Sequence, residues 1–128
     1  MKAIDTNVLV RIFVNDDKKQ AKLAKEYVIK NGVVFISNFV VCEFTWVLRK
    51  GYQFDFESVQ NAIELILRSK EFIVEDAKLL WEALNLFSKS SVEFADLLIG
   101  LIAKNNGVEM VGTFDKRAAK IELFELIV

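Results

Sequence analysis

Four carboxylates stand where the pattern of this chain favours apolar side chains, and the chain contains no histidine. Two of them follow strand-like runs, and two interrupt apolar helix-like stretches. They are Asp5, Glu43, Asp96 and Asp115. A buried carboxylate without a partner is costly even after the surroundings relax. Several such residues in one chain therefore predict a shared cation and divalent-metal chemistry.

Asp5 and Asp115 each follow a strand-like run. Asp5 comes after Lys2-Ala3-Ile4, and Asp115 comes after Val111-Gly112-Thr113-Phe114. Ligands of an open parallel sheet bind outside the carboxyl ends of its strands, so the two carboxylates face each other if these strands are neighbours. The competing interpretation is that each aspartate only caps the helix that follows it. The sequence leaves both interpretations open.

Glu43 lies on an apolar helical stripe. Its neighbours three and four residues away are Phe39, Val40, Trp46 and Val47. No basic residue stands one turn away to pair with it, and glutamate is almost never fully buried without a partner. The pattern therefore favours a functional role for Glu43 over a solvated helix face.

Asp96 and Glu93 share one face near a helix start, where the helix dipole favours anions. Gly100 on the same face leaves space for a partner backbone or a ligand. The alternative is that both acids only belong to the acidic first turn common in helices. The joint occurrence with Asp5, Glu43 and Asp115 favours a common site.

Carboxylates gathered without a cation repel one another by about 4 kcal/mol at about 4 Å and an effective dielectric of roughly 20. Oxygen-rich sites suit Mg²⁺ or Mn²⁺. Such an ion makes bound water a readier nucleophile and neutralises charge on a phosphate. Phosphodiester hydrolysis needs both effects. Without histidine the chain has no Ser-His-Asp or Cys-His machinery, and its one cysteine, Cys42, cannot assemble a zinc site.

Composition predicts one domain spanning residues 1–128. The chain is 53% hydrophobic with eleven phenylalanines, enough for one large core, and no apolar run is long enough to span a bilayer. Residues 1–5 read as a core strand instead of a secretory signal, so we expect a cytoplasmic protein. The formal charge of −1 does not indicate a nucleic-acid binder and does not exclude one.

Strand-like and helix-like patterns alternate along the chain, which predicts an α/β fold, an α/β/α sandwich on a mainly parallel sheet of about five strands. The helix at 38–50 is apolar almost all round and is expected to be deeply buried. Asp16 and Asp55 are predicted N-caps, and Gly32 is a predicted helix stop. Strands are expected at 2–5, 33–36, 72–74, 108–114 and 123–127, and helices at 7–14, 17–30, 38–50, 56–69, 76–89, 93–105 and 115–121.

The chain resembles the PIN-domain family, and in particular the VapC-type toxin ribonucleases. The resemblance covers essentially the whole chain and depends on four pieces taken together. These are Asp5-Thr6-Asn7-Val8-Leu9-Val10, Glu43 on a hydrophobic helix, Phe94-Ala95-Asp96-Leu97-Leu98-Ile99, and Thr113-Phe114-Asp115-Lys116.

The resemblance implies a parallel-sheet nuclease fold and Mg²⁺- or Mn²⁺-dependent cleavage of RNA. It also implies frequent homodimers and inhibition by a small co-encoded antitoxin. Asp5, Glu43, Asp96 and Asp115 would then be the catalytic, metal-binding acids. The resemblance gives Asn7 and Thr113 supporting roles and makes Glu93 an additional acid, although local hydrogen bonding explains Asn7 and Thr113 equally well.

Cationic candidates for phosphate contact are Lys116, Arg117 and Arg11. If Asp115 caps a helix, Lys116 and Arg117 lie in its first turn, which is the unfavourable end for cations. Phosphate contact is one reason for finding them there. Arg11 lies one turn beyond Asn7 on the same helix face. A solvated surface explains each of these three cations equally well.

The main hypothesis is a metal-dependent endoribonuclease. A second is a regulatory or binding module with weak or absent nuclease activity, whose apolar surface binds a partner. A third is a phosphate-accepting receiver-like domain of similar size. That fold needs an aspartate ending the third strand, and Val74-Glu75-Asp76 matches this requirement poorly.

Overall fold

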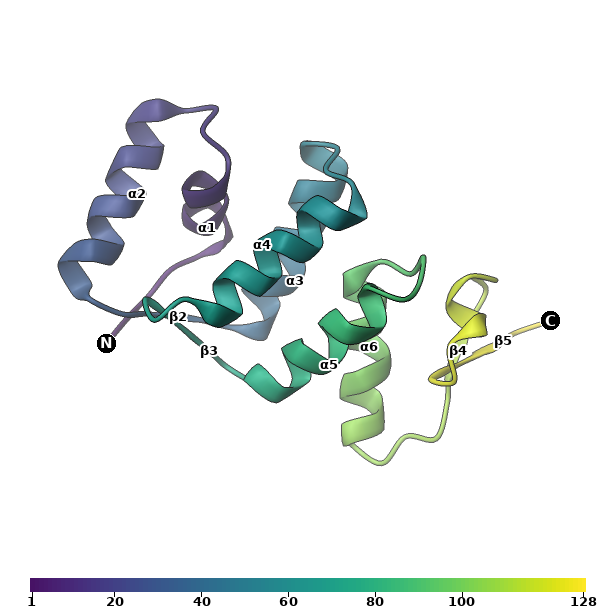
Figure 1. Cartoon of the computed structure of the whole chain (residues 1–128). Coiled ribbons are helices and arrows are strands. Elements are labelled where there is room, and N and C mark those ends of the chain that lie inside the picture. Colours follow the sequence, from purple (N-terminus) through teal and green to yellow (C-terminus); the bar gives the residue numbers. More distant parts are fainter. The chain divides into compact units, whose positions relative to one another are not determined.

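The computed structural model describes residues 1–128, which form two units, Met1–Ala77 and Lys78–Val128. Figure 1 labels their helices and strands in chain order. The first unit contains β1 (Lys2–Ala3), α1 (Thr6–Phe13), α2 (Lys18–Asn31), β2 (Val34–Ile36), α3 (Asn38–Trp46), the π-helical turn η1 (Val47–Gly51), α4 (Phe56–Arg68) and β3 (Phe72–Val74).

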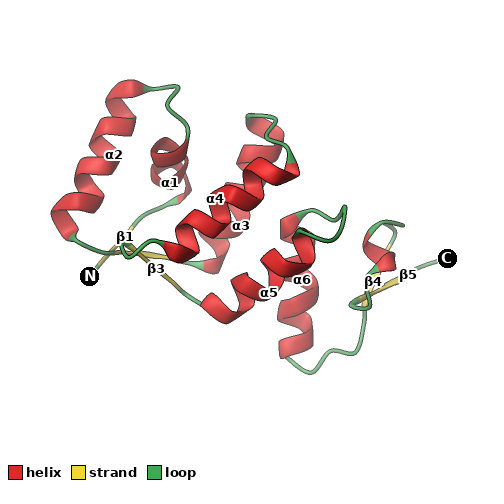
Figure 2. Ribbon diagram, viewed as in Figure 1, coloured by secondary structure: helices red, strands yellow, loops and turns green.

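The sheet of the first unit has the order β1-β2-β3, and both pairings are parallel. Figure 2 shows these short strands among the surrounding helices. Val34 and Ile36 of the central strand are fully buried, as the continuous apolar run predicts. The carboxyl ends of β1 and β2 lead into α1 and α3, so Asp5 lies at the edge of the sheet where the sequence predicts a ligand.

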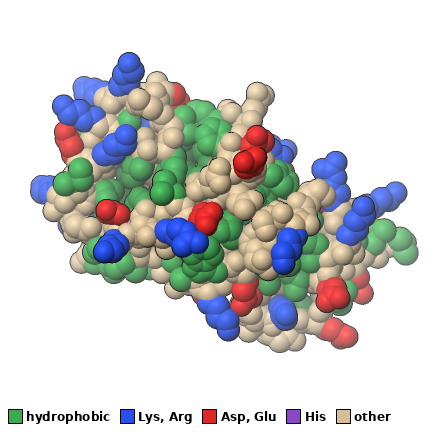
Figure 3. Space-filling model, in the orientation of Figure 1, with side chains coloured by type: hydrophobic (Ala, Val, Ile, Leu, Met, Phe, Trp, Pro, Cys, Tyr) green, Lys and Arg blue, Asp and Glu red, His purple; other side chains and the backbone are tan.

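Helix α2 has an apolar face and a lysine-rich face, as predicted. Its small and branched residues Ala21, Ala24 and Val28 are buried, and Figure 3 shows basic side chains gathered over α2. The predicted N-cap was wrong by one residue, because Asp17 caps the helix by accepting from Gln20 N–H at 3.0 Å. Asp16 binds other side chains instead. Gly32 ends the helix at φ 77°, a conformation that favours glycine.

Helix α3 does not fit the prediction of burial on all sides. Val41 and Phe44 are fully buried, whereas Phe39 is 71% exposed and Trp46 is 60% exposed. The buried face packs towards α1, where Phe13 and Phe44 meet edge to face with centroids 5.3 Å apart. The helix also ends earlier than predicted, since it continues as the π-helical turn η1.

The second unit contains α5 (Ala77–Phe87), α6 (Phe94–Asn105), β4 (Val111–Thr113), the 3₁₀ turn η2 (Ala118–Lys120) and β5 (Phe124–Leu126). Strands β4 and β5 pair in parallel. The strand predicted at 108–114 and the helix predicted at 115–121 are both shorter in the structure.

The core of the second unit is built on α6. Phe87 and Phe94 form an edge-to-face pair with centroids 5.6 Å apart. A Cβ at Gly100 would lie 2.9 Å from the Phe124 ring, so the space beside this glycine is filled by β5 and its flanking residues. Gly100 therefore serves close packing, not the ligand space that the sequence suggested.

Five strands, all paired in parallel, and six α-helices confirm the predicted α/β class. The strands form sheets of three and two rather than one sheet of five. None of the helices has both the length and the apolar character needed to cross a membrane.

Candidate active site

Asp5 is the N-cap of α1. Its Oδ1 accepts a hydrogen bond from Val8 N–H at 3.0 Å, which confirms the capping interpretation. Capping does not exclude ion binding, because a carboxylate has two oxygens and about four lone-pair sites. The exposed side chain of Asp5 therefore keeps an oxygen for a ligand while the cap holds its orientation.

Glu43 is exposed on α3, on the same face as Phe39 and Trp46. Its Oε1 accepts a hydrogen bond from Thr6 Oγ1 at 2.6 Å. The hydroxyl lies directly after Asp5 in the chain, so this bond links the segments that carry two predicted site acids. Sequence reasoning missed Thr6. The available signal was a hydroxyl residue immediately following a strand-end aspartate.

Asp96 is half-buried in the first turn of α6. Burial raises the pKa of its carboxyl above the usual range, and the nearby charges of Asp115 and Glu93 raise that pKa further. The structure thus brings Asp96 within electrostatic reach of the two other acids predicted in this half of the chain. Asp115 and Glu93 thus disfavour the charge on Asp96, and a cation beside Asp96 would relieve that effect.

Asp115 is exposed after β4, and hydrogen bonds on both sides orient its segment. Its N–H donates to Thr113 Oγ1 at 3.0 Å, and its Oδ1 accepts from Arg117 N–H at 2.8 Å. Thr113 thus makes the local strand-end hydrogen bond that was the alternative explanation for this residue. Its supporting role towards an ion or water remains a prediction, as does that of Asn7, which is exposed beside Asp5.

Arg11 belongs to a polar network at the end of α1. Its guanidinium lies 3.1 Å from Asp16 Oδ1 and 2.7 Å from Gln20 Oε1, and Tyr52 Oη donates to Asp16 Oδ2 at 2.7 Å. The hydrogen bond with Tyr52 is the main cause that raises the pKa of Arg11 and lowers the pKa of Asp16. These contacts give Arg11 a structural role. Its phosphate contact remains a prediction.

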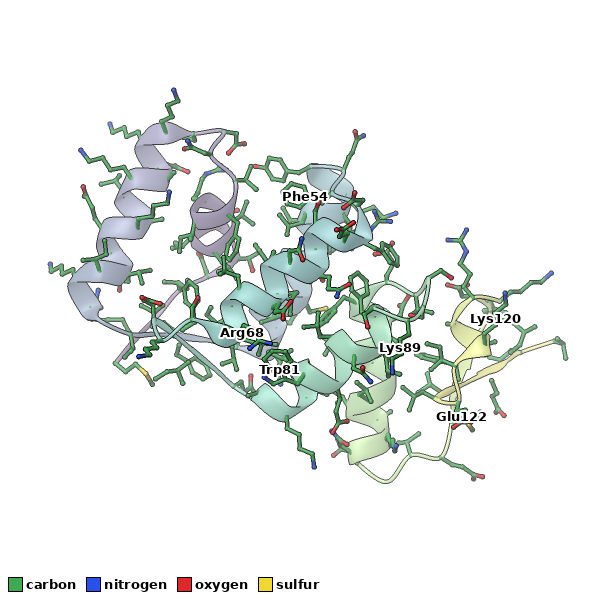
Figure 4. All side chains as sticks on the ribbon, in the orientation of Figure 1. Phe54, Arg68, Trp81, Lys89, Lys120 and Glu122 are labelled. Atoms are coloured by element: carbon green, nitrogen blue, oxygen red, sulfur yellow. The ribbon has the colours of Figure 1, made fainter.

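Each unit has a cavity, and only that of the first unit is lined by one of the candidate acids. In the first unit a cavity of about 600 Å³ is lined by Asp5, Asn7 and Arg11 together with apolar residues of α1 and α2. In the second unit a cavity of about 1140 Å³ has a mixed charged lining that includes Arg117. Figure 4 labels three of its other charged residues, Lys89, Lys120 and Glu122.

The donor chemistry of these residues suits a hard cation, because all the candidate ligands are oxygen donors. Asp5 and Glu43 lie in the first unit, whereas Glu93, Asp96 and Asp115 lie in the second. Neither unit by itself contains a cluster of three or more acidic or cysteine side chains able to hold a metal ion. The convergence of all four predicted ligands on one ion remains a prediction.

Comparison with known proteins identifies the family. The PIN domain family model matches residues 2–123. A VapC ribonuclease of Aquifex aeolicus (strain VF5) is 30% identical to this chain over 124 residues, covering 94% of the chain and 92% of the relative. The chain belongs to the PIN domain family. This confirms the resemblance found in the sequence.

Proposed function

We propose that this protein is a metal-dependent endoribonuclease that hydrolyses RNA phosphodiester bonds, and that it acts as the toxin of a toxin-antitoxin pair. Its similarity to a VapC ribonuclease over nearly the whole chain supports this function. The observation that carries the proposal is the environment of the Asp96 carboxyl. Partial burial raises its pKa, and the charges of Asp115 and Glu93 raise it further, a combination that is common at functional sites.

In the proposed site the carboxylates of Asp5, Glu43, Asp96 and Asp115 hold Mg²⁺ or Mn²⁺. The bound ion would acidify a water molecule and neutralise charge on the scissile phosphate. The cap at Asp5 and the turn at Asp115 hold these carboxylates in place before any ion binds. Glu93 adds negative charge near Asp96 and would strengthen the attraction for a cation.

Lys116 and Arg117 are the proposed contacts to the RNA backbone. Both side chains are exposed, and Arg117 N–H bonds Asp115, so its side chain starts next to a proposed ligand. Arg117 also lines the large cavity of the second unit, where Lys89 and Lys120 supply further positive charge. In the proposed site these cations would hold phosphate while the acids hold the ion.

The remaining parts of the proposal concern partners and location. We expect a small cognate antitoxin protein to inhibit the enzyme, and we expect the enzyme to form a homodimer in the cytoplasm. Co-purification with the product of a neighbouring small open reading frame would support the antitoxin. Light scattering of the purified protein measures the number of subunits.

The test of the nuclease function uses the purified full chain with structured and unstructured RNAs, in Mg²⁺, in Mn²⁺ and with a chelator. Cleavage should require a divalent ion. Asp5→Asn and Asp96→Asn should each lower cleavage by at least about a hundredfold, because each removes a charged ligand. The surface variant Lys30→Gln, on the far end of α2, is the matched control. Undiminished cleavage by both asparagine variants would refute the assignment.

The alternative function is a PIN-like binding or regulatory module with weak or no nuclease activity. The large exposed side chains of Phe39 and Trp46 on α3 favour it, since exposed apolar residues on one face often contact a partner. Metal titration in the presence of RNA separates the two functions. Tight binding to a protein partner without metal-dependent cleavage would favour the binding module.

A further inference from the structure

Thr6 joins the two acid-bearing segments of the first unit through a side-chain hydrogen bond. It is the first residue of α1, directly after Asp5, and its hydroxyl donates to Glu43 Oε1 on α3 at 2.6 Å. The two residues are 37 positions apart in the sequence, so the contact depends on tertiary packing. Hydrogen bonds from a hydroxyl to a carboxylate are short and strong, as this one is.

We propose that Thr6 is a positioning residue that orients the Glu43 carboxylate for divalent-ion binding. This inference rests on the proposed metal-dependent function. Glu43 is exposed, so without a donor its flexible side chain would sample many rotamers. The bond to Thr6 occupies Oε1, restricts these rotamers and leaves Oε2 for an ion.

The position of Thr6 explains why this residue suits the task. Successive Cα atoms lie about 3.8 Å apart, so the residue that binds Glu43 is the direct chain neighbour of Asp5. Asp5 is itself fixed by its cap to Val8 N–H. Thr6 is half-buried and β-branched, which limits its own rotamers. One helix start thus orients two carboxylates, one through the backbone and one through a side chain.

The experiment compares Thr6→Val, which keeps the shape and removes the donor, with Thr6→Ser, which keeps the donor. Mn²⁺ affinity is measured by calorimetry without RNA. Thr6→Val should weaken Mn²⁺ binding by about 10–100-fold, the usual effect of losing a residue that orients a ligand, and Thr6→Ser should restore most of it. A Thr6→Val affinity equal to wild type, or a Thr6→Ser affinity as weak as that of Thr6→Val, would overturn the inference.

A matched control is Thr45→Val, which removes another threonine hydroxyl of the same unit. Thr45 Oγ1 bonds the carbonyl of Cys42 rather than a carboxylate. This variant should change stability without changing Mn²⁺ affinity. An equal loss of affinity in Thr45→Val would mean that Thr6 acts only through general stability, and the inference would fail.

Two further measurements separate failure of this inference from failure of the proposed function. If Asp5→Asn binds Mn²⁺ as well as the wild type, the proposed metal site is wrong. If Asp5→Asn loses binding and Thr6→Val does not, only the role of Thr6 is wrong. In chelator, NMR couplings of the Glu43 methylenes should report one rotamer in the wild type and averaging in Thr6→Val. Averaging in both proteins would overturn the inference whatever the metal does.

Discussion

The two units hold their acidic residues in different ways. In the first unit, Asp5 and Glu43 each accept a hydrogen bond, from Val8 N–H and from Thr6 Oγ1. In the second unit, Asp96 is half-buried with a raised pKa beside Asp115 and Glu93. The first arrangement orients carboxylates with donors, whereas the second disfavours a carboxylate charge by partial burial and by repulsion from neighbouring acids.

In the proposed metal site, this difference would prepare the acids for an ion in two ways. Donors restrict a side chain so that less freedom remains to be lost when an ion binds. Repulsion raises the free energy of the ion-free state, so that a cation gains more by binding. The stability of the protein should therefore respond with opposite signs to neutralisation of Asp96 in the second unit and of the hydrogen-bonded Asp16 in the first unit.

Each unit contains an edge-to-face phenylalanine pair, and loss of a buried ring from one of these pairs has the largest expected effect on stability. Phe44 lies on the buried face of α3, and Phe94 is the first residue of α6. Each is buried within an edge-to-face pair. Phe44→Ala and Phe94→Ala should each lower the free energy of unfolding by about 3–5 kcal/mol, from lost transfer energy and a residual cavity. Urea unfolding measures both. A change under about 1 kcal/mol in either variant would show that the pair does not support its helix.

The close contact at Gly100 distinguishes the second unit. A methyl group there would lie 2.9 Å from the Phe124 ring and 3.1 Å from Leu123 Cβ. Gly100→Ala should therefore destabilise the protein by about 1–3 kcal/mol, because α6 and the strand must separate. Gly51→Ala in the first unit is the control, since its nearest neighbour would be 3.7 Å away. Equal melting temperatures for Gly100→Ala and wild type would contradict the packing role.

The cap at Asp5 tests the hydrogen-bonded arrangement of the first unit. Asp5→Ala should lower stability by about 1 kcal/mol, because Val8 N–H loses its acceptor. Asp5→Asn should keep nearly all the stability, since asparagine caps as well as aspartate. Thermal unfolding in chelator measures both variants. If Asp5→Asn is as unstable as Asp5→Ala, the charge rather than the cap stabilises α1.

The smallest expected effects are pH-dependent and have opposite signs in the two units. The raised pKa of Asp96 means that its charged form destabilises the fold above that pKa, and the penalty disappears as the pH falls towards the unfolded value of about 3.9. In chelator, Asp96→Asn should therefore be more stable than wild type at pH 7, by a margin that shrinks towards pH 4.

Asp16 in the first unit provides the opposite case. Its pKa is lowered, first by the hydrogen bond from Tyr52 and then by Arg11, so its charge stabilises the fold above the unfolded value of about 3.9. That contribution is lost as the pH falls through the lower, folded pKa. Asp16→Asn should be less stable than wild type at pH 7, with the difference closing in acid. Melting curves across pH would contradict the comparison if both variants shifted in the same direction.

Most elements were predictable because their signals are local. Alternating patterns indicated all five strands and six α-helices, and Asp55 caps α4 as its position before that helix predicts. Errors arose where a local signal had competitors. Asp16 and Asp17 are both residues that cap helices well. In the structure Asp16 accepts hydrogen bonds from Arg11 and Tyr52, and Asp17 caps α2.

The candidate acids were identifiable from residue type and spacing, but their partners were not. Burial of α3 was predicted from its composition, yet packing covers one face and leaves Phe39 exposed. Thr6 escaped notice because a threonine at a helix start is common, and its partner Glu43 lies 37 residues away. Contacts across such separations depend on how helices pack, which periodicity does not encode.

The amino-acid sequence by itself determined the order of the elements, the set of candidate acids and the family, because periodicity, capping and residue type act over a few positions. Only the tertiary structure decided which donors those acids meet and how their charges interact. A hydrogen bond such as that from Thr6 to Glu43 needs two side chains within about 3 Å, and a chain reaches that proximity only after its helices have packed.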